Sequence, residues 1–138
     1  MESRIDKTIE RHDKGYNCAQ AVACTYCDLL GYDEDMVFHM TEGFGAGMGG
    51  MDATCGALSG AVTLAGLKNS GGMECSPRTK GSTYKISKEM TKRFQETCGA
   101  LACRDLKGID TDRPAHPCEE CIKDAARIVE ELLFSETE

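Results

Sequence analysis

The chain has 138 residues, and its 16 Lys and Arg residues against 23 Asp and Glu residues give a formal net charge of −7. That length is typical of one domain, and the acidic balance argues against binding to nucleic acid or to an anionic membrane surface, because both need clustered positive charge. Hydrophobic residues make up 41% of the chain, which is too much for a disordered protein. We therefore expect a single domain over residues 1–138.

The first half of the chain carries helix signals and almost no strand signals. Three helices are predicted from residue types that favour helix N-termini, and their starts are Ser3 with Asp6, Asn17 with Gln20, and the acidic residues 33–35. Glycines at positions 15 and 31 are expected to end the first and second of these helices, because glycine is frequent just after a helix.

Helix signals continue in the second half. The expected elements are a helix over residues 55–67 capped by Asp52 or Thr54, a helix beginning at Ser82 or Thr83, a short helical turn over residues 100–107, and a last helix from Pro117 to about Phe134. Residues 69–81 and 108–116 are expected to be loops. The sequence therefore predicts an all-α, compact domain of five or six helices with a Gly-rich loop.

Nine cysteines are the most unusual feature of the composition. The charged N-terminus does not resemble a secretion signal, and no uncharged run reaches the roughly 20 apolar residues that a membrane span needs. We therefore expect a cytoplasmic protein. A reducing cytosol disfavours structural disulfides, and cysteines in that setting indicate metal or thiol chemistry.

Four cysteines lie where thiolates are favoured. Cys18, Cys55 and Cys118 fall at predicted helix N-termini, where unpaired N–H groups and the helix dipole stabilise an anion. Cys103 precedes Arg104, whose charge would have the same effect. These four could converge in a folded bundle and bind a metal or exchange disulfides. The alternative is that they are small buried hydrophobic residues.

The remaining five cysteines form less informative patterns; they are Cys24, Cys27, Cys75, Cys98 and Cys121. Two Cys-x-x-Cys pairs, at residues 24–27 and 118–121, are a spacing typical of zinc sites. The first pair lies in the middle of a predicted helix, however, and the gap between the pairs is far longer than in a zinc ribbon. We interpret Cys24 and Cys27 as packing residues or accessory thiols.

Histidines and the Gly-rich segment add weaker candidates. His116 could be a ligand or proton donor near Cys118, whereas His12 and His39 are expected to be surface or packing residues. Residues 43–50 contain a formal G-x-G-x-x-G, but no strand precedes it, so dinucleotide binding is not favoured. Backbone N–H groups of this segment could form a nest for an anion or for cluster sulfurs. It could also let the chain pass close to Cys55, or act as a flexible connector.

The combination of motifs resembles a known family. The motifs are Gly-Tyr-Asn-Cys-Ala-Gln over residues 15–20, the Gly-rich segment, Cys-Gly-Ala-Leu-Ser-Gly over 55–60, Cys-Arg-Asp-Leu over 103–106, and Cys118 before the last helix. From about Lys14 to Leu133 the chain resembles the redox-active protein family named for its cysteine pattern, C_GCAxxG_C_C. The family label reads Gly-Cys-Ala where this chain reads Cys-Gly-Ala.

The resemblance implies a small iron–sulfur or thiol-based redox protein, because a related region of split-Soret cytochromes carries an iron–sulfur centre. We expect an electron-transfer protein whose cluster, of unspecified nuclearity, is bound by the family cysteines Cys18, Cys55, Cys103 and Cys118. Glycines 45, 47 and 49 (Gly45, Gly47 and Gly49) would donate backbone hydrogen bonds to it.

Alternatives remain open at this point: a thiol–disulfide or sulfur-handling redox enzyme, a structural zinc module that mediates interactions, or a cysteine-rich core without metal. No redox partner or substrate follows from the sequence. Small residues on more than one face of the helix over residues 53–67 suit close contact with another backbone. We therefore also expect a homodimer.

Overall fold

The structure, a computed structural model, describes residues 1–75, 78–109 and 116–135, and within these ranges it contains helices and no strand. The helices are α1 (Ile5–Asp13), α2 (Cys18–Tyr26), α3 (Glu34–Thr41), α4 (Gly45–Met48), α5 (Gly56–Asn69), α6 (Lys80–Cys98), α7 (Cys103–Leu106) and α8 (Cys118–Leu133). Short 3-10 turns are η1 (Cys27–Leu30), η2 (Glu42–Phe44) and η3 (Met73–Cys75). The predicted all-α class is confirmed.

The number of helices differs from the predicted five or six. Ala46 and Gly47 inside α4 have φ values of 53° and 58°, so α4 is not a right-handed helix. Without it, seven helices remain in the ranges that the structure describes. The difference is α7, a single turn that the sequence predicted as a short helical turn over residues 100–107 and that is here counted as a helix.

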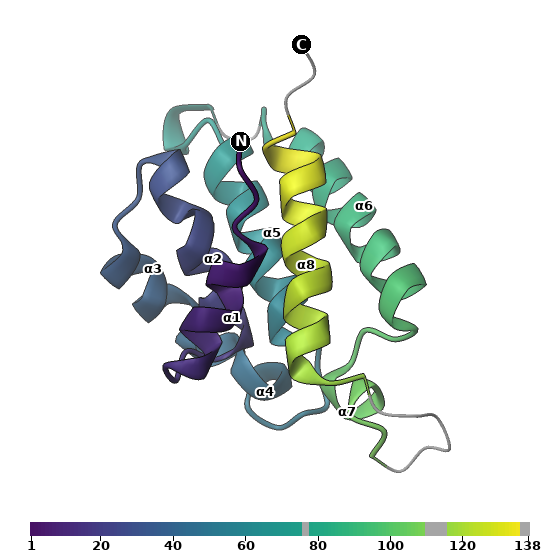
Figure 1. The fold of residues 1–138 in the computed structure, drawn as a ribbon. Helices are drawn as coiled ribbons and strands as arrows, with labels where there is room; N and C mark the ends of the chain where they lie inside the picture. Colours follow the sequence, from purple (N-terminus) through teal and green to yellow (C-terminus); the bar gives the residue numbers. More distant parts are fainter. Residues whose placement is uncertain (76–77, 110–115, 136–138) are drawn as a thin grey trace.

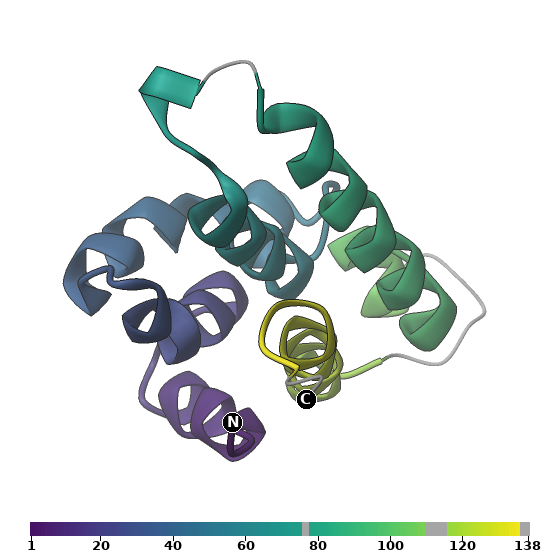
Figure 2. The ribbon, with the colours of Figure 1, turned by 90° about the horizontal axis from the view of Figure 1, so that it is seen from above.

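Helix α5 is the central element. It packs against α2, α6 and α8, while α1 covers α2 and α8, and α3 packs on α2. Helices α2, α5 and α8 run in the same direction, so their N-terminal ends lie at one end of the bundle beside α4 and α7 (Figure 1). Viewed along the bundle, α8 lies between α1 and α6, and α5 lies beside α8, above it in the picture (Figure 2). This parallel arrangement concentrates three helix N-termini at one end of the molecule.

Close packing of α2 on α5 depends on glycine. A Cβ atom on Gly60 would lie 2.6 Å from the carbonyl oxygen of Ala19, and one on Gly56 would lie 3.2 Å from the Ala19 nitrogen. The small residues of α5 are thus used within one chain. Association into a homodimer stays a prediction, and this face of α5 is not available for it.

Side-chain caps explain two helix starts. The Asn17 side chain accepts a hydrogen bond from the Gln20 N–H, and the Gln20 side chain accepts one from the Asn17 N–H, both at 2.9 Å. This is the predicted capping box. The acidic residues 33–35 lie at the start of α3, as predicted, and Asp33 caps this helix. The expected capping pair of Ser3 and Asp6 does not form, because Arg4 is the N-cap of α1. The Ser3 hydroxyl lies one residue earlier, where it accepts from the Ile5 N–H at 3.3 Å and donates to Glu130 of α8.

Helix α6 starts earlier than predicted. Helix α6 begins at Lys80, two residues before Ser82, and its C-terminal end is marked by Gly99 in the left-handed region.

Residues 76–77 and 110–115 of the two predicted loops lie outside the described residues. Among the helices that the structure describes, none combines the length and the apolar character needed to cross a bilayer.

Candidate functional site

A cavity of about 190 Å³ lies at the end of the bundle where the helix N-termini meet. Five cysteines line it: Cys18, Cys55, Cys103, Cys118 and Cys121. The first four are those that the sequence analysis selected, and they come from four different elements. Sequence reasoning missed Cys121, although its position one helical turn after Cys118 places both thiols on the same face of α8.

Each of the four predicted cysteines occupies a helix start. Cys18, Cys103 and Cys118 are the first residues of α2, α7 and α8, and Cys55 is the N-cap of α5. The backbone amides of the first turn of α5 act to lower the pKa of the Cys55 thiol. The predicted caps Asp52 and Thr54 are wrong, since Cys55 occupies the N-cap position and no side chain caps α5. Backbone N–H groups accordingly face the cavity at several points.

Backbone hydrogen bonds hold α7 against the segment that precedes α5. Three of them join residues 51–55 to residues 101–104: Cys55 N to Leu101 O (2.7 Å), Cys103 N to Ala53 O (2.9 Å) and Arg104 N to Met51 O (2.7 Å). They form an antiparallel contact around the isolated bridge between Thr54 and Ala102. This contact fixes the positions of Cys55 and Cys103 relative to each other.

The Gly-rich segment contains an unusual stretch of left-handed backbone. Ala46, Met48 and Met51 have φ values of 53°, 63° and 67°, a region that costs non-glycine residues roughly 1–2 kcal/mol each. Such strain persists only where the surrounding structure enforces it, and it clusters at functional sites. Ala46 lines the cysteine cavity. The segment is therefore a constrained wall of the site and not the flexible connector considered above.

The three glycines expected to donate hydrogen bonds to a cofactor have distinct surroundings. Gly47 has no room for a side chain, because a Cβ atom there would lie 2.6 Å from the Cβ of Cys103. The Gly49 N–H donates to the Gly45 carbonyl (2.9 Å), and Gly45 lies against the Asn17 side chain. The segment thus makes a close approach to Cys103, and the Phe44 carbonyl oxygen lies close to Gly56, the residue after Cys55.

The thiols of Cys18 and Cys118 interact with each other. This interaction lowers the pKa of Cys118, with further help from Lys107 and His12. The same interaction and burial raise the pKa of Cys18. Of the three cysteines at long-helix N-termini, Cys118 is the one that the surroundings favour as a thiolate in the absence of metal.

A second set of neighbouring thiols leads from the cavity toward α6; it consists of Cys55, Cys121 and Cys98. Interaction with Cys121 raises the pKa of Cys55, and burial acts in the same direction. The Cys121 thiol also interacts with Cys98, and the pKa of Cys121 is raised to about 12 by that contact and by burial, against the opposing effect of Cys55. The Cys98 thiol in turn donates to Asp124 Oδ2 at 3.4 Å.

The cation beside Cys103 is different from the one predicted. Arg104 Nε donates to Asp52 at 2.8 Å, whereas Lys107 is the group whose charge favours the Cys103 thiolate. Burial outweighs this effect and raises the pKa of Cys103. Lys107 also lines the cavity and therefore supplies positive charge to it.

Cys24 and Cys27 lie away from the cavity in the buried core of α2 and η1, and burial raises the pKa of Cys24 to about 12. This placement agrees with their interpretation as packing residues. The side chain of Cys75 lies outside the described residues. His39 is exposed, as expected, but both His12 and His116 line the cavity, so His12 is closer to the site than predicted.

Comparison with known proteins identifies one relationship. The model of a family described as Putative redox-active protein (C_GCAxxG_C_C) matches residues 16–132. This range includes all five cysteines that line the cavity. No curated protein and no solved structure matches the chain significantly.

Proposed function

Because the chain belongs to the C_GCAxxG_C_C family of redox-active proteins, we propose that it is a redox protein in which Cys18, Cys55, Cys103 and Cys118 hold an iron–sulfur cluster for electron transfer. The observation that carries the proposal is the convergence of these four thiols, from four separate elements, on one cavity. When bound, the cluster would supply a one-electron carrier whose potential depends on its hydrogen bonds and exposure.

The cavity and its ligands fit such a group. Its volume of about 190 Å³ is on the order of ten times what one water molecule needs, which leaves room for a polyatomic cofactor. Thiolates are the ligands that iron–sulfur clusters take from proteins. The positive ends of α2, α5 and α8 together with Lys107 would offset the negative charge of four thiolates.

The spacing of the cysteines favours a cluster over a structural zinc ion. Tetrahedral zinc with Zn–S bonds of about 2.3 Å requires sulfur atoms roughly 3.8 Å apart. Among the described residues, two groups bring three ligand atoms within 4.8 Å of one another, and neither contains Cys18, Cys55, Cys103 or Cys118. A cluster spans a wider set of ligands because its own inorganic sulfides fill the space between the irons.

Anaerobic purification, or reconstitution with ferrous iron and sulfide, tests this proposal. The protein should be brown, with charge-transfer absorption in the visible range and matching amounts of iron and acid-labile sulfide. Replacing Cys18, Cys55, Cys103 or Cys118 singly by Ser should remove most of the iron. The matched control is Cys27→Ser, a buried thiol outside the cavity, which should retain it. Colourless wild-type protein without iron after reconstitution would refute the cluster.

A second candidate function is thiol–disulfide exchange by Cys18 and Cys118. It is favoured by the position of both thiols in one cavity and by their interaction, which lowers the pKa of Cys118, because the thiolate is the attacking species. Forming one disulfide from two thiols releases two protons and two electrons, so a disulfide substrate must be reduced to two thiols in the same exchange. Iron-free protein in which Cys18 and Cys118 cycle reversibly, shown by peptide mass spectrometry, would favour this function.

A further inference from the structure

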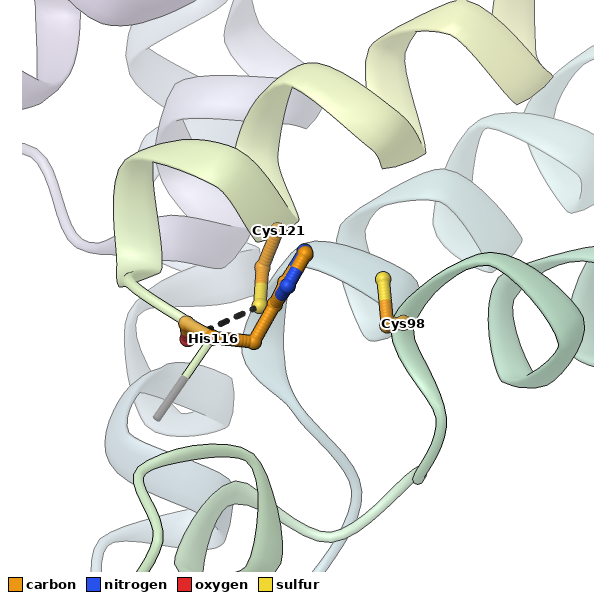
Figure 3. A group of neighbouring side chains, drawn as sticks. All are labelled: Cys98, His116 and Cys121. Carbon is orange, nitrogen blue, oxygen red and sulfur yellow. Dashed lines mark hydrogen bonds between the residues drawn. The ribbon is translucent and has the colours of Figure 1, made fainter. Parts of the chain in front are cut away.

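A second group of ligands lies beside the cysteine cavity, and it includes none of the four proposed cluster ligands. A thiol from the last residue of α6, a thiol from the first turns of α8 and the imidazole just before α8 come together: Cys98, Cys121 and His116. Their ligand atoms all lie within 4.8 Å of one another. Figure 3 shows the three side chains grouped between the end of α6 and the start of α8.

Asp124 holds this group in place. Its Oδ2 accepts from the Cys98 thiol at 3.4 Å and lies 3.0 Å from His116 Nε2. A carboxylate bound to one ring nitrogen fixes the imidazole and leaves the other nitrogen for a metal, which is the usual arrangement around protein-bound zinc. The Asp124 side chain is only 10% exposed, and Arg127 balances its charge through a contact of 2.9 Å to Oδ1.

We propose that Cys98, His116 and Cys121 bind one zinc ion, with Asp124 as the carboxylate that orients His116. Two cysteines and one histidine are a set of three protein ligands that zinc accepts, with a water molecule at the fourth position. Two thiolates neutralise the ion, and binding releases the two thiol protons. A tetrahedral site needs ligand atoms less than about 4 Å apart, so the present grouping requires only a small adjustment.

The zinc site is separate from the cluster site but adjacent to it. His116 and Cys121 also line the cavity, and the Cys121 thiol interacts with Cys55. The ion would therefore lie in the wall of the cavity and join the end of α6 to the start of α8. This role does not depend on the presence of a cluster, because all three ligands belong to the second group.

The test uses the full chain, reduced and freed of metal under anaerobic conditions, and titrated with zinc. One equivalent should bind and protect Cys98 and Cys121 from alkylation, as mapped by peptide mass spectrometry, while Cys18 stays reactive. The variants Cys98→Ser and His116→Gln should each bind zinc at least 10–100-fold more weakly, which is the loss typical of even an outer-shell partner. Asp124→Asn should lose affinity by about that factor, and Cys27→Ser is the matched control.

Cobalt(II) supplies a second readout that does not depend on stability. Wild-type protein should give the visible absorption of tetrahedral cobalt with thiolate ligands, and His116→Gln should shift this spectrum. Unchanged zinc affinity in Cys98→Ser and His116→Gln, absence of zinc binding, or protection of Cys18 and Cys118 in place of Cys98 would overturn the site. Loss of reconstituted iron from a folded Cys98→Ser variant would also overturn it, since Cys98 would then serve the cluster.

Discussion

Gly47 lies directly against Cys103: a Cβ atom on Gly47 would come within 2.6 Å of the Cys103 Cβ and 2.8 Å of the Ala53 carbonyl oxygen. The left-handed backbone of the Gly-rich segment thus packs directly against Cys103, the first residue of α7. Any atom added at position 47 must displace Cys103, a proposed cluster ligand, or the backbone that positions it.

The first prediction follows from this contact. Gly47→Ala should lower the iron content of reconstituted protein several-fold, because it moves Cys103 and because a φ of 58° is strained for alanine. Gly50→Ala is the control, since a Cβ atom at Gly50 meets nothing within 4 Å. Iron and sulfide analysis compares the two. Equal iron in both variants would show that Cys103 does not depend on this contact.

The second prediction concerns the packing of α2 on α5. Gly60→Ala should destabilise the protein by about 1–3 kcal/mol, because its Cβ would overlap the backbone of Ala19. Gly66→Ala, in the same helix but with open space around it, should stabilise by about 0.5–1 kcal/mol through helix propensity. Urea unfolding measures both changes. If both substitutions changed the free energy of unfolding in the same direction, the packing of α2 on α5 described here would be contradicted.

Light scattering on the Gly60→Ala protein extends this test to association. Because Gly60 contacts Ala19 of its own chain, the variant should have the same oligomeric mass as wild type, whether that mass is of a monomer or of the expected homodimer. A dimer that dissociates on this substitution would mean that the face of α5 is shared between chains.

The third prediction is a pH dependence. Arg11 donates two hydrogen bonds to Glu34, at 3.0 and 3.2 Å, and the Tyr16 hydroxyl donates a third at 2.7 Å. The Arg11 bonds hold the pKa of Glu34 below its ordinary value, so their stabilisation is present above the unfolded pKa of about 4.3 and is lost as pH falls through the folded value. The free energy of unfolding of metal-free protein should therefore fall below about pH 4.3.

Two variants test whether Glu34 causes this dependence of the unfolding free energy on pH. Glu34→Gln should remove part of the decline in unfolding free energy over that acidic range, whereas Glu10→Gln, at an exposed position of α1, should leave it as in wild type. Chemical unfolding at a series of pH values supplies the comparison. Identical slopes in wild type and Glu34→Gln would show that the Arg11–Glu34 contact is not maintained in solution.

The fourth prediction concerns the anchoring of the N-terminal residues and α2 to α8. Glu130 accepts hydrogen bonds from the buried Tyr26 hydroxyl and from the Arg4 N–H. Glu130→Ala would leave the Tyr26 hydroxyl without its partner, which should cost about 1–3 kcal/mol. The neighbouring Glu131, half-exposed and paired with Arg93, is the control, and Glu131→Ala should cost about 0–1 kcal/mol. Thermal unfolding gives the difference, and comparable losses would contradict this account.

The sequence alone predicted the helical class, the capping box at the start of α2 and the acidic start of α3, because these depend on residues that are neighbours in the chain. It also selected Cys18, Cys55, Cys103 and Cys118, since helix starts favour thiolates wherever they occur. Their convergence on one cavity was only a hypothesis at that point. A resemblance to one family added the expectation of redox chemistry, and the family match agrees with it.

The tertiary structure decided what depends on contacts between distant segments. Cys121 reaches the cavity because α8 packs against α5, and Cys98 reaches Asp124 because α6 packs against α8. The spacing from Cys118 places Cys121 on the same face of α8, but it does not say what that face contacts. The Cys55 cap likewise requires the pairing of residues 51–55 with residues 101–104. A local signal is complete within one helical turn, whereas a site is built from atoms that only the packing of the whole chain brings within bonding distance.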